Sequence, residues 1–254
     1  MRGRFSRTFM KGQVMNCLVK NYDAIQSEAC KSRVERQIEF MAQDVKYDPT
    51  LSSSCKNDIS RYCQDSSEST RKCLQRNFHQ ISHACARDEF GREQLNAHDI
   101  RRKRYVYKAC VYDISKFCND VRFGHDGDVL DCMREHRYEE SMSSRCKDAI
   151  TKDMIVMVDD YKLDPKLTKY CSSEIAALCM DALNSVEHKD SDTHNGVVLE
   201  CLVNNSDKIS KQNMMCKRRV RKIMKHMAED IRMDPDVSDK CTFLLFLSFQ
   251  AKST

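Results

Sequence analysis

The sequence predicts an all-α protein, organised as a tandem array of disulfide-bonded three-helix cysteine-rich repeats. Among 254 residues there are 15 cysteines but only six glycines, three prolines and no tryptophan. Scarce glycine and proline disfavour the many turns of a β-sandwich. The cysteines recur at fixed spacings, and the apolar residues between them recur with helical periodicity.

Three Cys-x7-Cys segments each open a unit that contains a third and a fourth cysteine further along. From each fourth cysteine to the next first cysteine there are always 24 residues. The three sets are Cys55, Cys63, Cys73, Cys85; Cys110, Cys118, Cys132, Cys146; and Cys171, Cys179, Cys201, Cys216. We expect a partial repeat over 1–49, complete repeats over 50–104, 105–165 and 166–235, and a truncated start of a further repeat over 236–254.

Apolar residues follow the fourth cysteine at +4, +8, +11 and +15 in three copies, which predicts a helix of about four turns. They are Val34, Ile38, Met41, Val45; Ile150, Met154, Met157, Tyr161; and Val220, Met224, Met227, Ile231. The helix after Cys85 departs from the pattern, because Glu89 and Glu93 occupy apolar positions.

Aspartates and prolines recur near the ends of these helices. An aspartate at +14 predicts a structural hydrogen bond or a cap in every copy: Asp44, Asp99, Asp160 and Asp230. Asp-Pro pairs at 48–49, 164–165 and 234–235 predict helix ends, because proline cannot continue a helix.

Two further segments of each unit also read as helices. The opening segments carry an acid at +3, isoleucine at +4 and an apolar residue at +7, so one face would hold Ile59, Tyr62, Ile114, Phe117, Ile175 and Leu178. A glycine stands five residues before the third cysteine in three copies (Gly12, Gly127 and Gly196), where it can start a new helix.

Four cysteines allow three connectivities, among which sequence alone cannot select. If the opening helix and the helix after the third cysteine form an antiparallel hairpin, inner cysteines pair with inner and outer with outer. That arrangement predicts Cys63–Cys73 and Cys55–Cys85, Cys118–Cys132 and Cys110–Cys146, and Cys179–Cys201 and Cys171–Cys216. Each bridge would contribute roughly 3–4 kcal/mol on the chain-entropy model.

The remaining cysteines belong to incomplete units. Cys17 and Cys30 fit third and fourth positions, and Cys241 fits a first position, so we expect them to be unpaired by truncation. This many cysteines persist as disulfides only in an oxidising compartment. The sequence shows neither an apolar signal region near its start nor an apolar stretch of about 18 residues, so we expect a fragment of a secretory protein.

No catalytic, cofactor-binding or metal-binding residues are predicted. There is no phosphate loop, nucleophile elbow or zinc-protease helix, and a gap of seven between cysteines does not suit zinc. His79 and His83 have the spacing of a two-ligand clip, but surface histidines are the simpler interpretation. The basic runs at 101–104 and 217–222 are interpreted as solvated helix faces rather than nucleic-acid sites, and the first is also a candidate dibasic processing site.

The Cys-x7-Cys opening with Asp-Ile inside, the Cys-Leu third position and the 24-residue spacer resemble the cysteine-rich repeats of the Golgi apparatus protein 1 family. That family is also described as a cysteine-rich fibroblast growth factor receptor and an E-selectin ligand. The resemblance implies a type I sialoglycoprotein of the Golgi membrane that binds growth factors, and it covers about residues 12–241. The transmembrane helix that the resemblance implies is not in this chain.

We therefore expect a Golgi-lumenal binding protein, not an enzyme, that needs no cofactor and recognises fibroblast growth factors or other secretory glycoproteins. The alternative is a structural or adhesive stalk that carries glycans. The sequon at Asn204 is an expected N-glycosylation site. Two other helical classes, the twin Cys-x9-Cys hairpin of mitochondria and the saposin-type lipid-binding module, fit the cysteine pattern less well.

Overall fold

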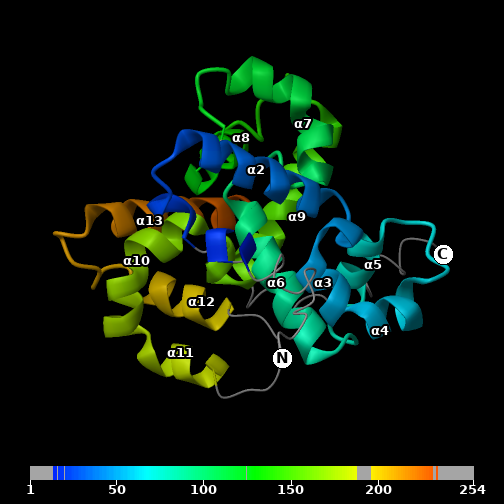
Figure 1. Ribbon diagram of the computed structural model, residues 1–254. Coiled ribbons are helices and arrows are strands. Elements are labelled where there is room, and N and C mark those ends of the chain that lie inside the picture. The colour runs from blue at the N-terminus through cyan, green and yellow to red at the C-terminus, as the bar shows by residue number, and fades with distance from the viewer. Residues whose placement is uncertain are drawn as a thin grey trace, which may run out of the picture. The chain divides into compact units, whose positions relative to one another are not determined.

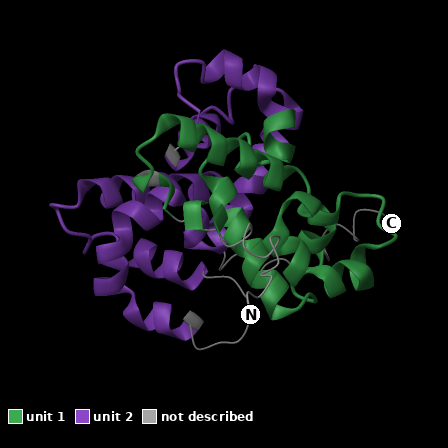
Figure 2. Cartoon of the chain, in the orientation of Figure 1, with its two compact units in different colours: residues 1–108 green, residues 109–254 purple. Residues whose placement is uncertain are grey.

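The computed structural model describes residues 14–15, 17–19, 21–123, 125–187, 196–230 and 233. All regular elements within these residues are helices (Figure 1), which confirms the all-α prediction. The chain divides into two compact units, residues 1–108 and 109–254, which are described separately (Figure 2). The repeat boundaries at 49, 104, 165 and 235 stay a prediction.

The helices that carry the fourth cysteine are α2 (Glu28–Gln43), α6 (His83–Ala97), α9 (Ser144–Asp159) and α13 (Met214–Glu229). Each begins two residues before its cysteine. The residue directly before the helix, Ser27, Ser82, Ser143 or Asn213, accepts a hydrogen bond through its side chain from the cysteine backbone N–H. This is an N-cap, which satisfies a donor that the first turn leaves unpaired.

The aspartate at +14 follows these helices and caps a short 3-10 helix. Asp44 accepts from the Lys46 backbone N–H at 3.1 Å before η2 (Val45–Tyr47), and Asp160 accepts from Lys162 at 2.8 Å before η5 (Tyr161–Leu163). Asp99 likewise accepts from the backbone N–H of Arg101, two residues on. The prediction of a structural hydrogen bond or cap is confirmed for these three copies, while the residues that follow Asp230, 231 and 232, lie outside the described residues.

The prediction that Asp-Pro ends these helices is wrong, because the pair begins the next helix. Pro49 is the first residue of α3 (Pro49–Ser54) and Pro165 that of α10 (Pro165–Leu178). Proline is tolerated there because its missing N–H would have no helical partner. Asp48 and Asp164 are the N-caps, and each accepts from two backbone N–H groups. The third pair, at 234–235, lies outside the described residues.

The predicted apolar stripes are buried in α2 and α9 but not fully in α13. Val34, Ile38, Ile150 and Met154 are all at most 3% exposed. Met224 was predicted in the core and lies at the surface, 36% exposed, because α13 buries Val220, Ile223 and His226 instead. Met227 is half-buried, and Ile231 is outside the described residues.

The opening segments form three variants of one helix: α4 (Lys56–Asp58) continued by the π-helix η3 (Ile59–Cys63), α7 (Arg104–Phe117), and α10. The third cysteines lie on α5 (Thr70–Arg76), α8 (Asp128–Glu135) and α12 (Gly196–Asn204). Among its described residues, the last repeat contains α11 (Met180–Glu187) besides the predicted helices, in its longer gap between the second and third cysteines. Two of the three predicted glycines precede or start the third helix: Gly127 is the N-cap of α8, with φ 69°, and Gly196 begins α12. Gly12 lies outside the described residues. Two further short 3-10 helices among the described residues are η1 (Tyr22–Ala24) and η4 (His125–Gly127).

The basic run at 101–104 is not a solvated helix face as predicted. Its first three residues form the turn before α7. Arg102 is buried and donates to the Leu95 carbonyl at 3.2 Å, and Lys103 pairs with Glu93 at 2.7 Å. The run therefore connects α6 to α7 through buried polar contacts.

Candidate functional site

Each repeat is held by two disulfides between the opening segment and the helices that carry the third and fourth cysteines. The outer pairs are Cys55–Cys85, Cys110–Cys146 and Cys171–Cys216, with Cα–Cα distances of 4.7, 4.7 and 4.9 Å. The inner pairs are Cys63–Cys73, Cys118–Cys132 and Cys179–Cys201, at 5.8, 6.1 and 5.8 Å. The structure thus brings together the cysteines that the hairpin arrangement pairs, with nearly the same geometry in each copy.

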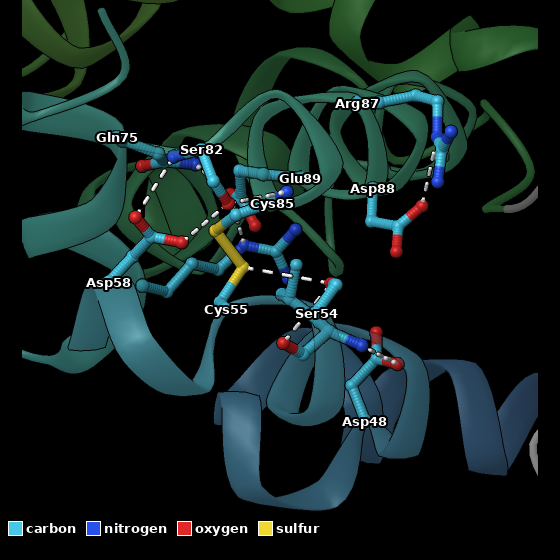
Figure 3. Close-up of a disulfide and its surroundings, with 12 residues drawn as sticks. Asp48, Ser54, Cys55, Asp58, Gln75, Ser82, Cys85, Arg87, Asp88 and Glu89 are labelled. Atoms are coloured by element: carbon cyan, nitrogen blue, oxygen red, sulfur yellow. Dashed lines mark hydrogen bonds and ion pairs between the residues drawn. A yellow bond between two sulfur atoms is a disulfide. The ribbon is translucent and has the colours of Figure 1, made fainter. Parts of the chain in front are cut away.

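A polar clamp lies beside each outer disulfide. The Asp58 carboxylate accepts from the backbone N–H of Ser82 at 2.9 Å and from its hydroxyl at 2.7 Å (Figure 3). Asp113 makes the same two bonds to Ser143, at 3.1 and 2.6 Å. The acid thus holds the residue that caps the fourth-cysteine helix, and this explains the acid at +3 of the opening segment.

The third repeat keeps the clamp with exchanged residues. Glu174 stands at +3 and accepts from the Asn213 side chain at 3.3 Å. Here both partners differ from the other copies, yet the contact between the opening segment and the N-cap persists.

A recurrent asparagine is a feature that sequence reasoning missed. Four residues after the third cysteine, Asn21, Asn77 and Asn205 donate from Nδ2 to the backbone carbonyl of that cysteine, each at 2.9 Å. The same carbonyl also accepts from the asparagine's own backbone N–H, at 3.0–3.1 Å, so the side chain adds a second hydrogen bond at the end of the helix. The available signal was the asparagine itself, at one offset in three of four copies.

The caps at Asp48 and Asp164 are also buried ion-pair partners. Arg92 of α6 pairs with Asp48, and Arg219 of α13 lies 2.7 Å from Asp164. Both aspartates are at most 1% exposed. The start of α3, which leads into the opening segment of the first repeat, and the start of α10 are therefore each fixed to the fourth-cysteine helix of the same repeat, in addition to the outer disulfide.

Glu89 occupies an apolar position of α6 and is buried there, 1% exposed. Its Oε1 accepts from Arg71 Nε and Gln75 Nε2, both at 3.1 Å, while Oε2 has no hydrogen-bond partner among the described residues. Burial raises the pKa of Glu89 to about 7, against the attraction of Arg71 and together with repulsion from Glu93. The departure of this helix from the apolar pattern is thus a buried polar cluster.

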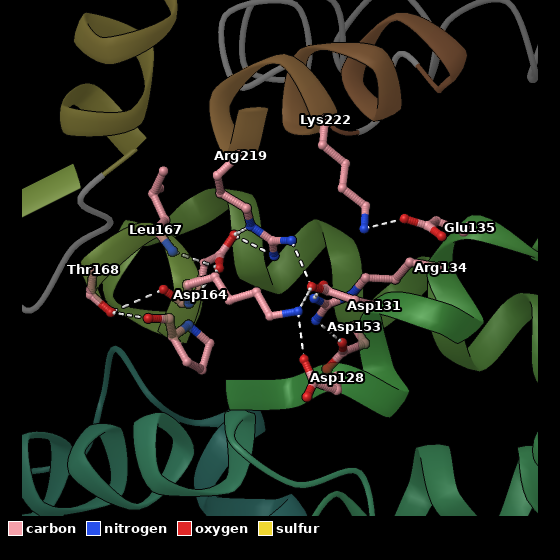
Figure 4. Close-up of polar contacts among 12 residues, drawn as sticks. Asp128, Asp131, Arg134, Glu135, Asp153, Asp164, Leu167, Thr168, Arg219 and Lys222 are labelled. Atoms are coloured by element: carbon pink, nitrogen blue, oxygen red, sulfur yellow. Dashed lines mark hydrogen bonds and ion pairs between the residues drawn. The ribbon is translucent and has the colours of Figure 1, made fainter. Parts of the chain in front are cut away.

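A buried ion network joins the second and third repeats within residues 109–254 (Figure 4). The Oδ1 atom of Asp131, on α8, lies 3.1 Å from Nη1 of Arg134. Its Oδ2 atom lies 2.7 Å from Nζ of Lys166 and 2.8 Å from Nη1 of Arg219. Arg134 also pairs with Asp153 of α9 at 2.8 Å. Two of these contacts cross from α8 of one repeat to α10 and α13 of the next.

Charge compensation keeps this network ionised. Burial by itself favours the protonated form of Asp131, but Arg219 and Arg134 outweigh it and hold the pKa of Asp131 well below its usual range. Breaking one partner of such a network leaves a buried charge uncompensated, which costs about 3–5 kcal/mol. The network therefore fixes the contact between two repeats.

The remaining predicted residues are placed as follows. Cys17 and Cys30 are free thiols, Cys17 exposed and Cys30 half-buried, and Cys241 lies outside the described residues. Asn204 is exposed at the last residue of α12. His79 lies after α5 and His83 begins α6, both exposed. Across the described ranges no three His, Cys, Asp or Glu side chains gather as a metal site, and none of the helices is long and apolar enough to span a bilayer.

Known proteins match this arrangement of cysteines and helices. A family model described as "Cysteine rich repeat" matches residues 28–82, 84–141 and 144–210. Each match begins at or next to the start of a fourth-cysteine helix, so the outer disulfides link consecutive matched segments. No solved structure matches the chain.

The similar curated proteins carry one name. Golgi apparatus protein 1 of Gallus gallus is 28% identical over 84% of this chain and 18% of its own length. The Rattus norvegicus protein is 31% identical over 90% of the chain and 20% of its length. The Caenorhabditis elegans homolog is 27% identical over 91% of the chain and 22% of its own length. The chain thus spans about a fifth of the length of the curated relatives it matches. It belongs to the cysteine-rich repeat family of Golgi apparatus protein 1, a family of Golgi proteins.

Proposed function

We propose that this chain is a non-catalytic binding module of a Golgi glycoprotein, and that it binds growth factors or other secretory proteins through outward-facing helix surfaces. The name of the matching family refers to a cysteine-rich fibroblast growth factor receptor, which supports fibroblast growth factors as the first ligands to test. A second support comes from apolar side chains that this chain exposes on one of its helices.

The observation that carries the proposal is an exposed apolar pair on α7. Tyr112 is 85% exposed and Val111 39%. They follow the first cysteine of the second repeat, and the same two positions are Lys56-Asn57 and Ser172-Ser173 in the other repeats, all exposed. The repeat frame therefore does not require apolar residues there.

Tyrosine on a rigid helix is suited to protein recognition. Exposed tyrosines are enriched among residues that dominate binding energy, because one side chain offers apolar area and a polar end. Two disulfides per repeat fix the helix that carries Tyr112, so little conformational entropy is lost on binding.

A glycan-bearing spacer is the second candidate. The buried network around Asp131, which fixes two successive repeats, and the exposed sequon at Asn204 favour it. A spacer would need rigidity and glycans but no specific ligand surface.

The test is binding of fibroblast growth factors to the immobilised, oxidised chain over a range of salt concentrations. We expect saturable binding that Tyr112→Ala weakens about tenfold or more, a hot-spot effect. Met180→Ala is the matched control, because Met180 is an exposed apolar residue (46%) of the same unit. No saturable binding to any growth factor tested would favour the spacer, and equal effects of both substitutions would remove α7 from the proposal.

A further inference from the structure

The outward side of α13 differs in charge from the equivalent helices of the other repeats. α13 contains six Lys/Arg and one Glu. α2 and α9 each contain three basic and three acidic residues, and α6 has two basic and three acidic residues. All four helices have the same place after the fourth cysteine, so the fold does not require this charge.

The cations of α13 divide into one that serves the core and several that face outward. Arg219 points inward to Asp164 (Figure 4). Arg218, Arg221 and Lys225 are exposed and lie at i, i+3 and i+7, which places them on one helix face. Lys217 lies beside them and Lys222 at the edge, where it pairs with Glu135.

Few local anions neutralise this outward row. Within the described residues, Arg218 and Arg221 have no ion-pair partner, and Lys225 has only Glu229, at 3.6 Å and at the end of the helix. From Lys217 to Lys225 the row is about 12 Å long. A linear polymer with repeated anionic groups would match a row of this kind better than one small anion would.

We propose that the outward face of α13, formed by Lys217, Arg218, Arg221 and Lys225, binds sulfated linear glycan chains. Short lysine- and arginine-rich segments suit such polyanions, and arginine can donate two parallel hydrogen bonds to one anionic group. This surface and ligand are distinct from α7 and the growth factors proposed above.

Two other polyanions fit less well. Nucleic acid is not expected in the oxidising compartment that six disulfides require. A helix that lies in a membrane surface must insert its apolar face into lipid. In α13 that face is used internally, since Cys216, Val220 and Ile223 are at most 1% exposed.

The experiment measures binding of the full oxidised chain to immobilised heparin as the sulfated glycan, with desulfated heparin for comparison. The test variant is Arg218→Gln/Arg221→Gln/Lys225→Gln. The matched control, Arg145→Gln/Lys147→Gln/Lys152→Gln, removes the same charge from α9 of the same unit. Circular dichroism and non-reducing mass analysis verify that both fold with their disulfides.

We expect the chain and the α9 control to bind heparin alike, and the α13 variant to bind about 100-fold more weakly, because each cation near an anionic surface contributes about a factor of five. Desulfated heparin should not bind. The proposal is overturned if the two variants weaken binding equally, if the chain does not bind heparin at moderate salt, or if phosphatidylserine vesicles bind it as well as heparin does.

Discussion

The buried carboxyl of Glu89 makes the stability of residues 1–108 depend on pH in a predictable direction. Its pKa is about 7 in the folded chain, compared with an ordinary value of 4.5. Because the folded value is the higher one, the native chain binds an extra proton between these pH values. The contribution of Glu89 to stability is therefore fully present below pH 4.5 and is lost as pH rises through 7.

The magnitude follows from the two pKa values. One unit of pKa difference corresponds to about 1.4 kcal/mol, so between pH 5 and pH 8 this carboxyl should lower the free energy of unfolding by about 2–3 kcal/mol. Glu89→Gln keeps the shape of the side chain and its contacts with Arg71 but cannot ionise. This substitution should therefore remove that part of the pH dependence and stabilise the chain at pH 8.

Urea unfolding with disulfides intact, followed by circular dichroism at pH 5 and pH 8, measures the effect in both proteins. Hydrogen exchange of the α6 amides localises it to this unit. Glu28→Gln is the matched control, because Glu28 is a carboxylate of the same unit whose side chain is 86% exposed. Identical pH dependence in the parent chain and in Glu89→Gln would refute the reasoning.

Other predictions concern the frame of the repeats. Non-reducing peptide mapping should recover the six pairs described above, and a bridge between the first and second cysteines of one opening segment would contradict the hairpin. Arg219→Met should lower the free energy of unfolding by about 3–5 kcal/mol, because Asp131 and Asp164 lose a buried partner. Lys225→Met, the control, should change it by less than about 0.5 kcal/mol. Urea unfolding of both variants measures the difference, and equal effects would be inconsistent with the network. Asp58→Ala should cost about 1–3 kcal/mol, since the backbone N–H and hydroxyl of Ser82, the N-cap of α6, lose their shared charged acceptor. An unchanged midpoint of urea unfolding would mean that the clamp is not needed. Expressed in the secretory pathway, the chain should lose one glycan on Asn204→Gln but not on Asn205→Gln, as mass spectrometry would show, and an unchanged mass would mean that the sequon is unused.

The sequence by itself determined the helical class, the cysteine frame and most of the apolar stripes. These are local or strictly periodic properties. The spacing of Val34 and Ile38, or of Ile150 and Met154, follows from 3.6 residues per turn, whatever lies across the core. Capping is equally local, since the aspartate at +14 bonds to a backbone N–H two residues away.

Only the tertiary structure decided how side chains distant in sequence meet. Glu89 looked like a break in an apolar helix until Arg71, 18 residues earlier, was placed beside it. The acid at +3 acquired a role only when Asp58 met Ser82, 24 residues on. Met224 lies outside the core because the rotation of α13 depends on what packs beneath it, and a one-dimensional pattern does not contain that information.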